Sequence, residues 1–200
     1  MLNIVLNEYS AAETASITGL KVATQRDWRR RGFLSSTEDG SHARFKLPTL
    51  AEIFTMRQMS NQGLWPDIFA DVAKLTARGI LFHRMKFSDC YEGSKDAIER
   101  FCGRRNTPEI KIMRHLGYGE EQPKKYLIAW AQNPLGARST EFTDNLDAAF
   151  NKKTKGKLGI DFLNQEGPVV VFNLEAIAIG LRPPEGKAFV RIEDSQDFPL

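Results

Sequence analysis

Hydrophobic and polar positions in the first 80 residues follow helical spacing, in short segments that end at glycine. Ser10 followed by Glu13 has the form of a capping box and predicts a helix that ends at Gly19. A second helix is predicted a few residues later, with Trp28 turned inward and Gly32 in the left-handed position that ends it. Two short helices joined by a tight turn are the pattern of a helix-turn-helix.

The segment after this pair predicts a small hairpin. Asp39 and Gly40 form a strong turn signal, and the alternation from His42 to Phe45 predicts a returning strand. In a winged helix-turn-helix, such a hairpin is the wing that lies beside the second helix.

Two further helices are predicted to complete the first part of the chain. Residues 49–52 have the form of a second capping box, and the helix that they open is expected to end at Gly63. Pro66 suits the first turn of the next helix, which is expected to end at Gly79. The residues expected on the inner faces of these helices are Ile53, Met56 and Met59, then Ile68, Val72 and Leu75. The order of elements predicts a winged helix-turn-helix over residues 1–85, mostly α with a small wing hairpin.

The rest of the chain predicts a helical connector over residues 86–124 and a small α+β domain over residues 125–200. Glycine and proline recur too often in the connector for one long helix, so two short helices are expected, at residues 94–102 and 107–117. In the last part, strands are expected at 126–130, 169–172 and 188–192, and helices at 143–150 and 175–181. The second of these strands is expected to be buried, as are Leu146, Ala149 and Phe150 of the first helix. The fold class expected for the whole chain is α+β.

Composition places the chain among ordinary globular proteins. Of its 200 residues, 42% are hydrophobic and 26% are charged, which argues against wholesale disorder. The net charge of +3 lies in residues 1–85, which hold 11 Lys/Arg and 8 Asp/Glu, whereas residues 86–200 hold 17 of each. No apolar run approaches the roughly 20 residues that span a bilayer, and no secretory signal is seen at the start. Two cysteines without such a signal fit a reducing compartment, so we expect a cytoplasmic protein without membrane contact.

The second predicted helix concentrates arginine. Arg26, Arg29, Arg30 and Arg31 surround Trp28 in one helix-sized window. Arg26 and Arg30 are four residues apart and share an outward face. Such a face suits a groove of DNA, and a solvated surface helix is the alternative interpretation.

Residues 9–79 carry a spaced set of polar, aromatic, apolar and glycine positions. They are Tyr9, Glu13, Ala15, Gly19, Thr24, Arg26, Trp28, Arg30, Gly32, Phe33, Leu34, Arg44, Phe45, Leu50, Ile53 and Gly63. In this register the segment resembles the DNA-binding domain of the MerR family, whose second helix reads roughly T-L-R-Y-Y/W-E-R-x-G-L-L. The chain departs from that family at three positions. Ala23 stands where the family commonly has a basic residue, Gln25 where the family has an apolar residue, and Asp27 where the family usually has tyrosine.

The resemblance implies a sequence-specific transcription regulator of bacterial or phage type that binds double-stranded DNA. The recognition helix over residues 21–31 would lie in the major groove, and the wing near Arg44 would lie on the backbone. The candidate DNA contacts are Thr24, Gln25, Arg26, Arg30, His42 and Arg44, although Gln25 also shares the inward spacing of Trp28. Because one module covers little DNA, a homodimer joined through the second half is expected. A small-molecule or protein effector is left open.

Two other functions stay open, and an enzyme within residues 120–200 is a remote third. An excisionase-like architectural factor shares the same core, and DNA bending distinguishes it from a regulator. A protein-interaction module that has lost DNA binding is the second, with Asp27 as the sign of the loss.

Other chemistry has weaker signals. Cys90 and Cys102, with His83 and His115 nearby, fit no tight zinc spacing, so two ordinary buried thiols without metal or cofactor are expected. The lysines at positions 152, 153, 155 and 157 suit either a solvated loop or an extra phosphate contact. The chain carries no H-E-x-x-H, G-x-S-x-G or G-x-G-x-x-G motif, and we expect no enzymatic activity.

Overall fold

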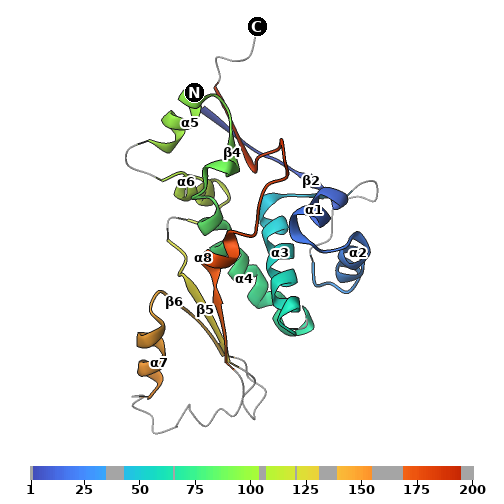
Figure 1. Ribbon diagram of the computed structural model, residues 1–200, viewed down its shortest axis with the longest axis vertical. Helices are drawn as coiled ribbons and strands as arrows, with labels where there is room; N and C mark the ends of the chain where they lie inside the picture. Colours follow the sequence, from blue (N-terminus) through green and yellow to red (C-terminus); the bar gives the residue numbers. More distant parts are fainter. Residues whose placement is uncertain are drawn as a thin grey trace.

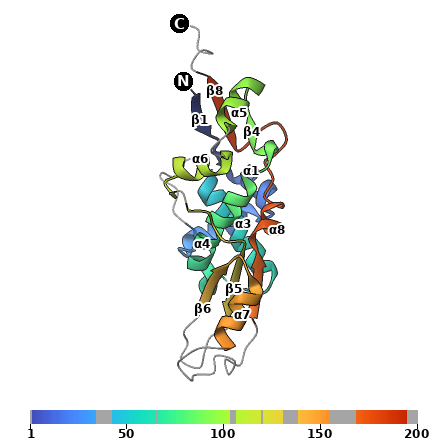
Figure 2. The ribbon, with the colours of Figure 1, turned by 90° about the vertical axis from the view of Figure 1, so that its left-hand side faces the viewer.

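The computed structural model describes residues 2–34, 43–64, 66–103, 107–119, 121–130, 139–154 and 169–194, and these residues form the mixed α+β fold that was expected. Figure 1 shows an elongated molecule with helices in the middle, one small sheet at the end where the chain starts, and another sheet at the opposite end. The view in Figure 2 shows the same succession along the long axis. A pair of short helices projects from one side of the central helices (Figure 1).

The elements of the first part of the chain are β2 (Tyr9–Ser10), α1 (Ala11–Thr18), α2 (Val22–Arg30), β3 (Arg44–Phe45), α3 (Leu47–Asn61) and α4 (Pro66–Arg84). The four helices follow the predicted order. Strand β2 was not predicted, and among the described residues β3 pairs with β2 and not with a second strand of the expected hairpin. The first capping box is confirmed: the Ser10 N–H donates to Glu13 Oε2 at 2.7 Å, and the Glu13 N–H donates to Ser10 Oγ at 3.2 Å. Gly19 and Gly63 have φ of 71° and 78°, so both helix ends are also confirmed.

The second predicted capping box is wrong. Helix α3 begins at Leu47, because Lys46 takes the N-cap position and Pro48 fits the first turn. Residues 49–52 therefore lie within the helix, and Glu52 is buried. The predicted inner residues Ile53, Met56 and Met59 are buried.

Helix α4 continues past the predicted end at Gly79 and stops at Arg84. Gly79 lies inside the helix, and its bare backbone packs against Leu174: a Cβ there would lie 2.7 Å from the Leu174 side chain. Val72 is half-buried, but Leu75 is 62% exposed, so its predicted burial is wrong. The side chain of Ile68 lies outside the described part.

A three-stranded sheet joins the start of the described chain to its end. Strand β1 (Leu2–Leu6) pairs antiparallel with β8 (Val190–Asp194) along its whole length. Strand β4 (Tyr91–Glu92) pairs parallel with the other edge of β8. The sequence left β1 unassigned, and β8 begins two residues after the predicted strand.

Both predicted helices of the connector are confirmed. They are α5 (Lys95–Cys102) and α6 (Pro108–His115), and a short 3-10 turn, η1 (Ser88–Cys90), precedes β4. Gly93 follows β4 with φ 148°, and a Cβ there would lie 2.5 Å from the Ile192 carbonyl oxygen. Only glycine fits this junction between β4 and β8 without strain.

The second sheet has the strand order β6-β5-β7 and is antiparallel throughout. Its elements and the helices beside it are β5 (Tyr126–Trp130), β6 (Ser139–Thr143), α7 (Leu146–Thr154), β7 (Val169–Asn173) and α8 (Leu174–Ala178). The predicted strands at 126–130 and 169–172 are confirmed, whereas β6 was missed and α8 is shorter than expected. Helix α7 begins at Leu146, since the Asn145 side chain caps it by accepting from the Ala148 N–H at 2.9 Å.

Burial in this second sheet is only partly as predicted. Ala149 is buried, but Phe150 is exposed. Val169 and Val171 are also exposed, whereas Phe172 is buried, so β7 covers the core with one face only. The prediction of a fully buried strand is therefore wrong.

One main hydrophobic cluster extends from Tyr9 to Ile192 and includes residues on both sides of the boundary drawn at residue 85. Helix α3 lies at its centre, with Leu47, Leu50 and Ile53 fully buried. Among the described residues, no helix combines the length and apolar character needed to cross a membrane.

Candidate nucleic-acid interface

The turn between α1 and α2 is held by hydrogen bonds from its own residues. The Gly19 N–H donates to the Ala15 carbonyl at 2.9 Å. The Thr18 hydroxyl donates to the Thr14 carbonyl at 2.7 Å and accepts from the Leu20 N–H at 3.2 Å. Leu20 is buried beneath the turn. The direction of α2 relative to α1 is thus determined locally.

Gln25 holds α2 against α1 and is fully buried. Its side-chain amide donates to the Leu20 carbonyl at 2.8 Å and to the Ala11 carbonyl at 3.1 Å. Its inward spacing is confirmed, but its assignment as a DNA contact is wrong, because both amide protons are used inside the protein.

Trp28 anchors the other end of α2 and is buried, as predicted. Its carbonyl accepts from the Phe33 N–H at 2.9 Å, and Gly32 has φ 77°, so the predicted helix end is confirmed. Leu34 then enters the core. Helix α2 is therefore a nine-residue helix whose inner face packs against the rest of the protein.

The outer face of α2 carries Arg26 and Arg30, both exposed. Arg26 makes no ion pair with any residue that the structure describes. Thr24, another candidate contact, is half-buried on the flank of the helix. The predicted outward face is confirmed for the two arginines.

Asp27 neutralises part of this face. Its Oδ1 accepts from Arg30 Nη2 at 2.7 Å, and its Oδ2 lies 3.9 Å from Arg31 Nη1. The Arg31 guanidinium also lies 4.6 Å from the centre of the Phe33 ring. The Asp27 carboxylate thus faces both Arg30 and Arg31, and Arg30 must exchange a protein partner before it can bind another anion.

The wing strand is fastened to both helices. Strand β3 pairs antiparallel with β2, which places Arg44 opposite Ser10, the N-cap of α1. Arg44 is exposed, while Phe45 is buried. The Arg29 guanidinium lies over the Phe45 ring, 5.4 Å from the ring centre. Arg29 therefore connects α2 to β3. The predicted contact His42 and the turn at 39–40 lie outside the described residues.

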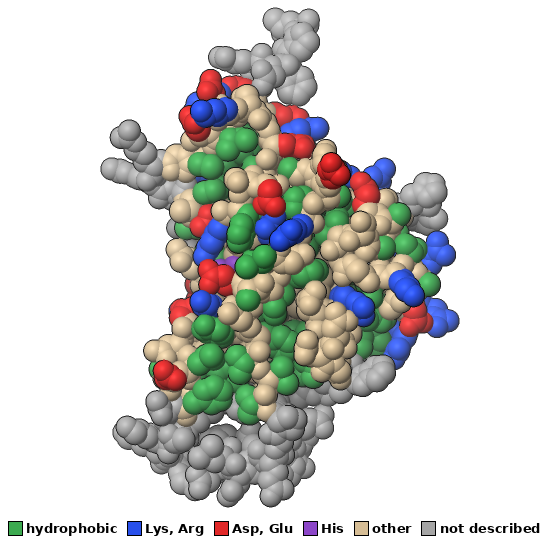
Figure 3. All heavy atoms as spheres, in the orientation of Figure 1, with side chains coloured by type: hydrophobic (Ala, Val, Ile, Leu, Met, Phe, Trp, Pro, Cys, Tyr) green, Lys and Arg blue, Asp and Glu red, His purple; other side chains and the backbone are tan. Residues whose placement is uncertain are grey.

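Two exposed lysines next to these elements were missed. Lys21 immediately precedes α2, whose N-terminus has no side-chain cap, and Lys46 follows β3 directly. The sequence could have indicated both lysines as candidate contacts, because each lies directly next to an element expected to face DNA. Residues 21–34 hold five Lys/Arg and one Asp/Glu. Figure 3 shows Lys and Arg side chains gathered on the rim where α2 lies.

The base of this helix pair rests on the segment before β8. Lys187 Nζ donates to Glu13 Oε1 and to the Glu8 carbonyl, both at 2.8 Å. Hydrogen bonds from Lys187 and from the Ser10 N–H lower the pKa of Glu13 to about 2. The Tyr9 hydroxyl donates to the Ala188 carbonyl at 2.8 Å, and burial raises the pKa of Tyr9. The start and the end of the chain thus support the two helices together.

No protein-family model and no curated protein matches the chain. The case for a nucleic-acid interface therefore depends on the geometry and charge of α2 and β3.

The cysteines form a separate feature. Cys90 is fully buried, its Sγ donates to the Arg84 carbonyl at 3.3 Å, and burial raises the pKa of its thiol to about 12. Cys102 is half-buried, and burial also raises its pKa. Within the described residues, no group of three or more His, Cys, Asp or Glu could hold a metal ion. The side chains of the lysines at 152, 153, 155 and 157 lie outside the described part.

Proposed function

We propose that this protein is a bacterial or phage transcription regulator that binds double-stranded DNA through α2 and the β2–β3 wing, in the manner of MerR-like proteins. The observation that carries the proposal is the division of α2 into two faces. Gln25 and Trp28 fix its inner face to the protein, and Arg26 and Arg30 are presented on its outer face.

The dimensions of α2 support this proposal. Nine residues give a helix of about 13 Å, and its diameter with side chains of about 10–12 Å matches the roughly 12 Å width of the major groove. The helix projects from the side of the molecule, where a duplex can approach it (Figure 1).

The surroundings of α2 supply cations for the phosphate backbone. Arg44 lies on the wing strand and Lys46 immediately after it, and both are exposed. Lys21 adds charge at the N-terminus of α2, where the helix dipole also favours an anion. These groups would position the protein, while Arg26 would reach base edges.

Asp27 favours a second candidate function, a protein-interaction module. Its carboxylate lies on the outer face of α2 and occupies Arg30, and an acid in that place repels phosphate. A basic or mixed-charge protein partner would tolerate it. The two candidates make different predictions for removal of this charge.

A homodimer is part of the proposal, because a single nine-residue helix contacts too few base pairs to select a site in a genome. Selection of bound sites from random duplexes tests this directly. A palindromic site, with a dimer in sedimentation, is the expected result, and a monomer on an asymmetric site would contradict the dimer.

Fluorescence anisotropy at several salt concentrations tests the interface itself. We expect Arg44→Ala to weaken specific and random duplexes alike and to reduce the slope of log K against log salt by about 0.9, as for one lost phosphate contact. Arg26→Ala should weaken binding at least as much. Lys95→Ala, which removes an exposed cation from α5, is the control and should change nothing. Equal affinity for all three variants and the parent chain would contradict DNA binding through α2.

A further inference from the structure

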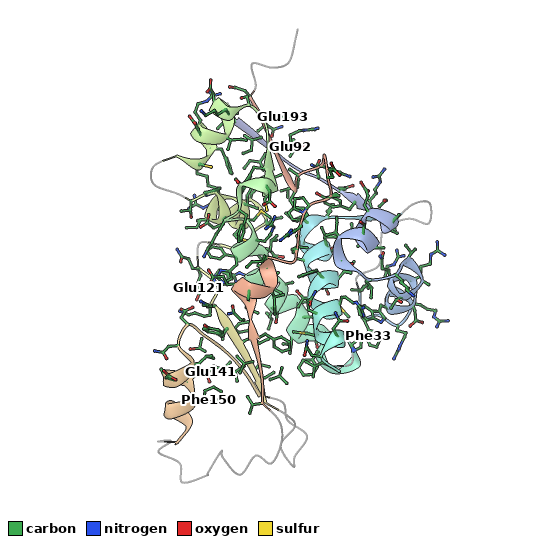
Figure 4. The ribbon with its side chains drawn as sticks, in the orientation of Figure 1. Phe33, Glu92, Glu121, Glu141, Phe150 and Glu193 are labelled. Atoms are coloured by element: carbon green, nitrogen blue, oxygen red, sulfur yellow. The ribbon has the colours of Figure 1, made fainter. Side chains whose placement is uncertain are left out.

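A cavity of about 240 Å³ lies between α4 and the segment that leads into β5. Leu75, Arg78 and Gly79 of α4 form one wall, and Pro123 and Phe142 form the other. Figure 4 places Glu121, at its rim, on the side of the molecule opposite Phe33 next to α2. The cavity is therefore separate from the candidate nucleic-acid interface.

The cavity has an apolar floor. Leu75 is 62% exposed, although α4 is otherwise buried around Ala73, Thr76 and Ala77. Pro123 and Phe142 add apolar surface to the lining, and Gly79 lines the cavity with backbone alone. Exposure of the Leu75 side chain to water beside Pro123 is unfavourable, and an apolar ligand that covered Leu75 would remove this cost.

Arg78 supplies one charged group with unused hydrogen-bonding capacity. Its Nη2 donates to the Glu121 carbonyl at 3.2 Å, and its guanidinium lies 5.7 Å from the centre of the Tyr118 ring. Its Nε is buried and has no hydrogen-bond partner among the described residues. No described carboxylate pairs with Arg78, whereas Lys124, also at the rim, is held by Asp144 at 2.9 Å.

We propose that this cavity binds a small carboxylic acid with an apolar body. The planar guanidinium of Arg78 has the geometry that carboxylates prefer, and the apolar body would lie against Leu75, Pro123 and Phe142. The volume is below the roughly 300–1,000 Å³ of sites for drug-sized ligands, so nucleotides and peptides are too large. This proposal does not depend on DNA binding.

Titration of the full chain with benzoate and hexanoate, followed by calorimetry and by amide chemical shifts, tests the proposal. We expect millimolar dissociation constants, with shifts at residues that line the cavity. Benzamide and hexanol, which match the two acids in shape without their charge, should bind at least tenfold more weakly. Failure of both acids to bind at 20 mM, or equal binding of acid and neutral analogue, would overturn the proposal.

Variants locate the binding. Arg78→Gln should abolish binding of benzoate, and Lys74→Gln is the matched control, because Lys74 is an exposed cation on the same helix outside the cavity. Equal loss in both variants would show only general charge attraction and would overturn the site. If Arg78→Gln did not fold, Arg78→Lys, which keeps the charge without the planar fork, should weaken benzoate binding, and unchanged affinity in that variant would contradict the role of Arg78.

Discussion

Replacing Asp27 with asparagine removes the one described acidic group from the outer face of α2. In the structure this carboxylate holds Arg30 at 2.7 Å and lies 3.9 Å from Arg31. If α2 binds duplex DNA, Asp27→Asn should strengthen binding, because a repulsive charge is lost and Arg30 is freed to contact a phosphate. If the face binds a basic or mixed-charge protein, the same change should do nothing for DNA.

The size of the effect follows from the exposure of the pair. The Arg30 side chain is 81% exposed, and exposed ion pairs contribute about 0–1 kcal/mol, so α2 should keep its fold without Asp27. One added phosphate contact steepens the slope of log K against log salt by about 0.9. Affinity should therefore rise about fivefold at 0.15 M salt and about fifteenfold at 0.05 M salt.

Fluorescence anisotropy with a labelled random duplex measures both quantities. Asp71→Asn is the matched control, because Asp71 is fully exposed on α4 and its loss changes the net charge by the same amount. A double variant, Asp27→Asn with Arg30→Ala, should lose most of the gain.

Two results would refute the reasoning. An equal gain in Asp27→Asn and Asp71→Asn would show that only net charge matters, not the face of α2. A loss of affinity in Asp27→Asn, with the helix content unchanged by circular dichroism, would show that the ordering of Arg30 by Asp27 is needed for binding.

The remaining predictions concern stability and the thiols. Gly93→Ala should lower the free energy of unfolding in urea by about 2–3 kcal/mol, since φ 148° is strained for alanine and a Cβ meets the Ile192 carbonyl; an unchanged midpoint would contradict this packing. Burial lowers the pKa of His83 below its ordinary 6.5, so the unfolded chain binds the proton more readily and stability should fall as pH drops below 6.5. His83→Leu should flatten that dependence in urea titrations from pH 7 to 5. Cys90→Ser with Cys102→Ser should leave DNA affinity unchanged with or without oxidant or metal, because burial raises the pKa of both thiols; a metal-dependent affinity that the double variant lost would overturn this.

Elements specified by neighbouring residues were predicted from the sequence. The capping box at Ser10 and Glu13 and the glycine at position 19 act within one turn of helix, so their pattern alone locates α1. The same holds for Ser94, whose side chain caps α5 by accepting from the Ala97 N–H. Outward placement of arginines on α2 also followed from spacing.

Features that depend on distant residues were not predictable in this way. Gly79 has the appearance of a helix end, but the residues after it, Ile80, Leu81 and Phe82, are buried in the core, and Gly79 itself packs against Leu174. Gln25 is polar on a helix expected to bind DNA, and its burial depends on carbonyls of α1 and the turn. Strand β1 was not predicted, because residues 2–6 are too short a segment to assign alone and their pairing partner, β8, lies more than 180 residues away in the sequence.

The same connection changes the expectation for a fragment. Residues 1–85 were expected to form the DNA-binding domain, but the Tyr9 hydroxyl and Glu13 both have partners in the segment before β8. A fragment of residues 1–85 should therefore unfold at lower urea concentration than the full chain. Equal urea midpoints for the fragment and the full chain, measured by circular dichroism, would show that residues 1–85 fold independently.

Pairing of β1 with β8 also sets the order of events during synthesis. Val190, the partner of Leu6, is 184 positions further along the chain, so at about 5–20 residues per second it is made roughly 10–40 s later. Throughout that interval β1 has no strand beside it and Tyr9 has no carbonyl for its hydroxyl. Translation that stops before residue 187 leaves α1 and α2 without the contacts that Lys187 and Ala188 make with Glu13 and Tyr9. Chains that end before this segment should therefore be less stable than the full chain.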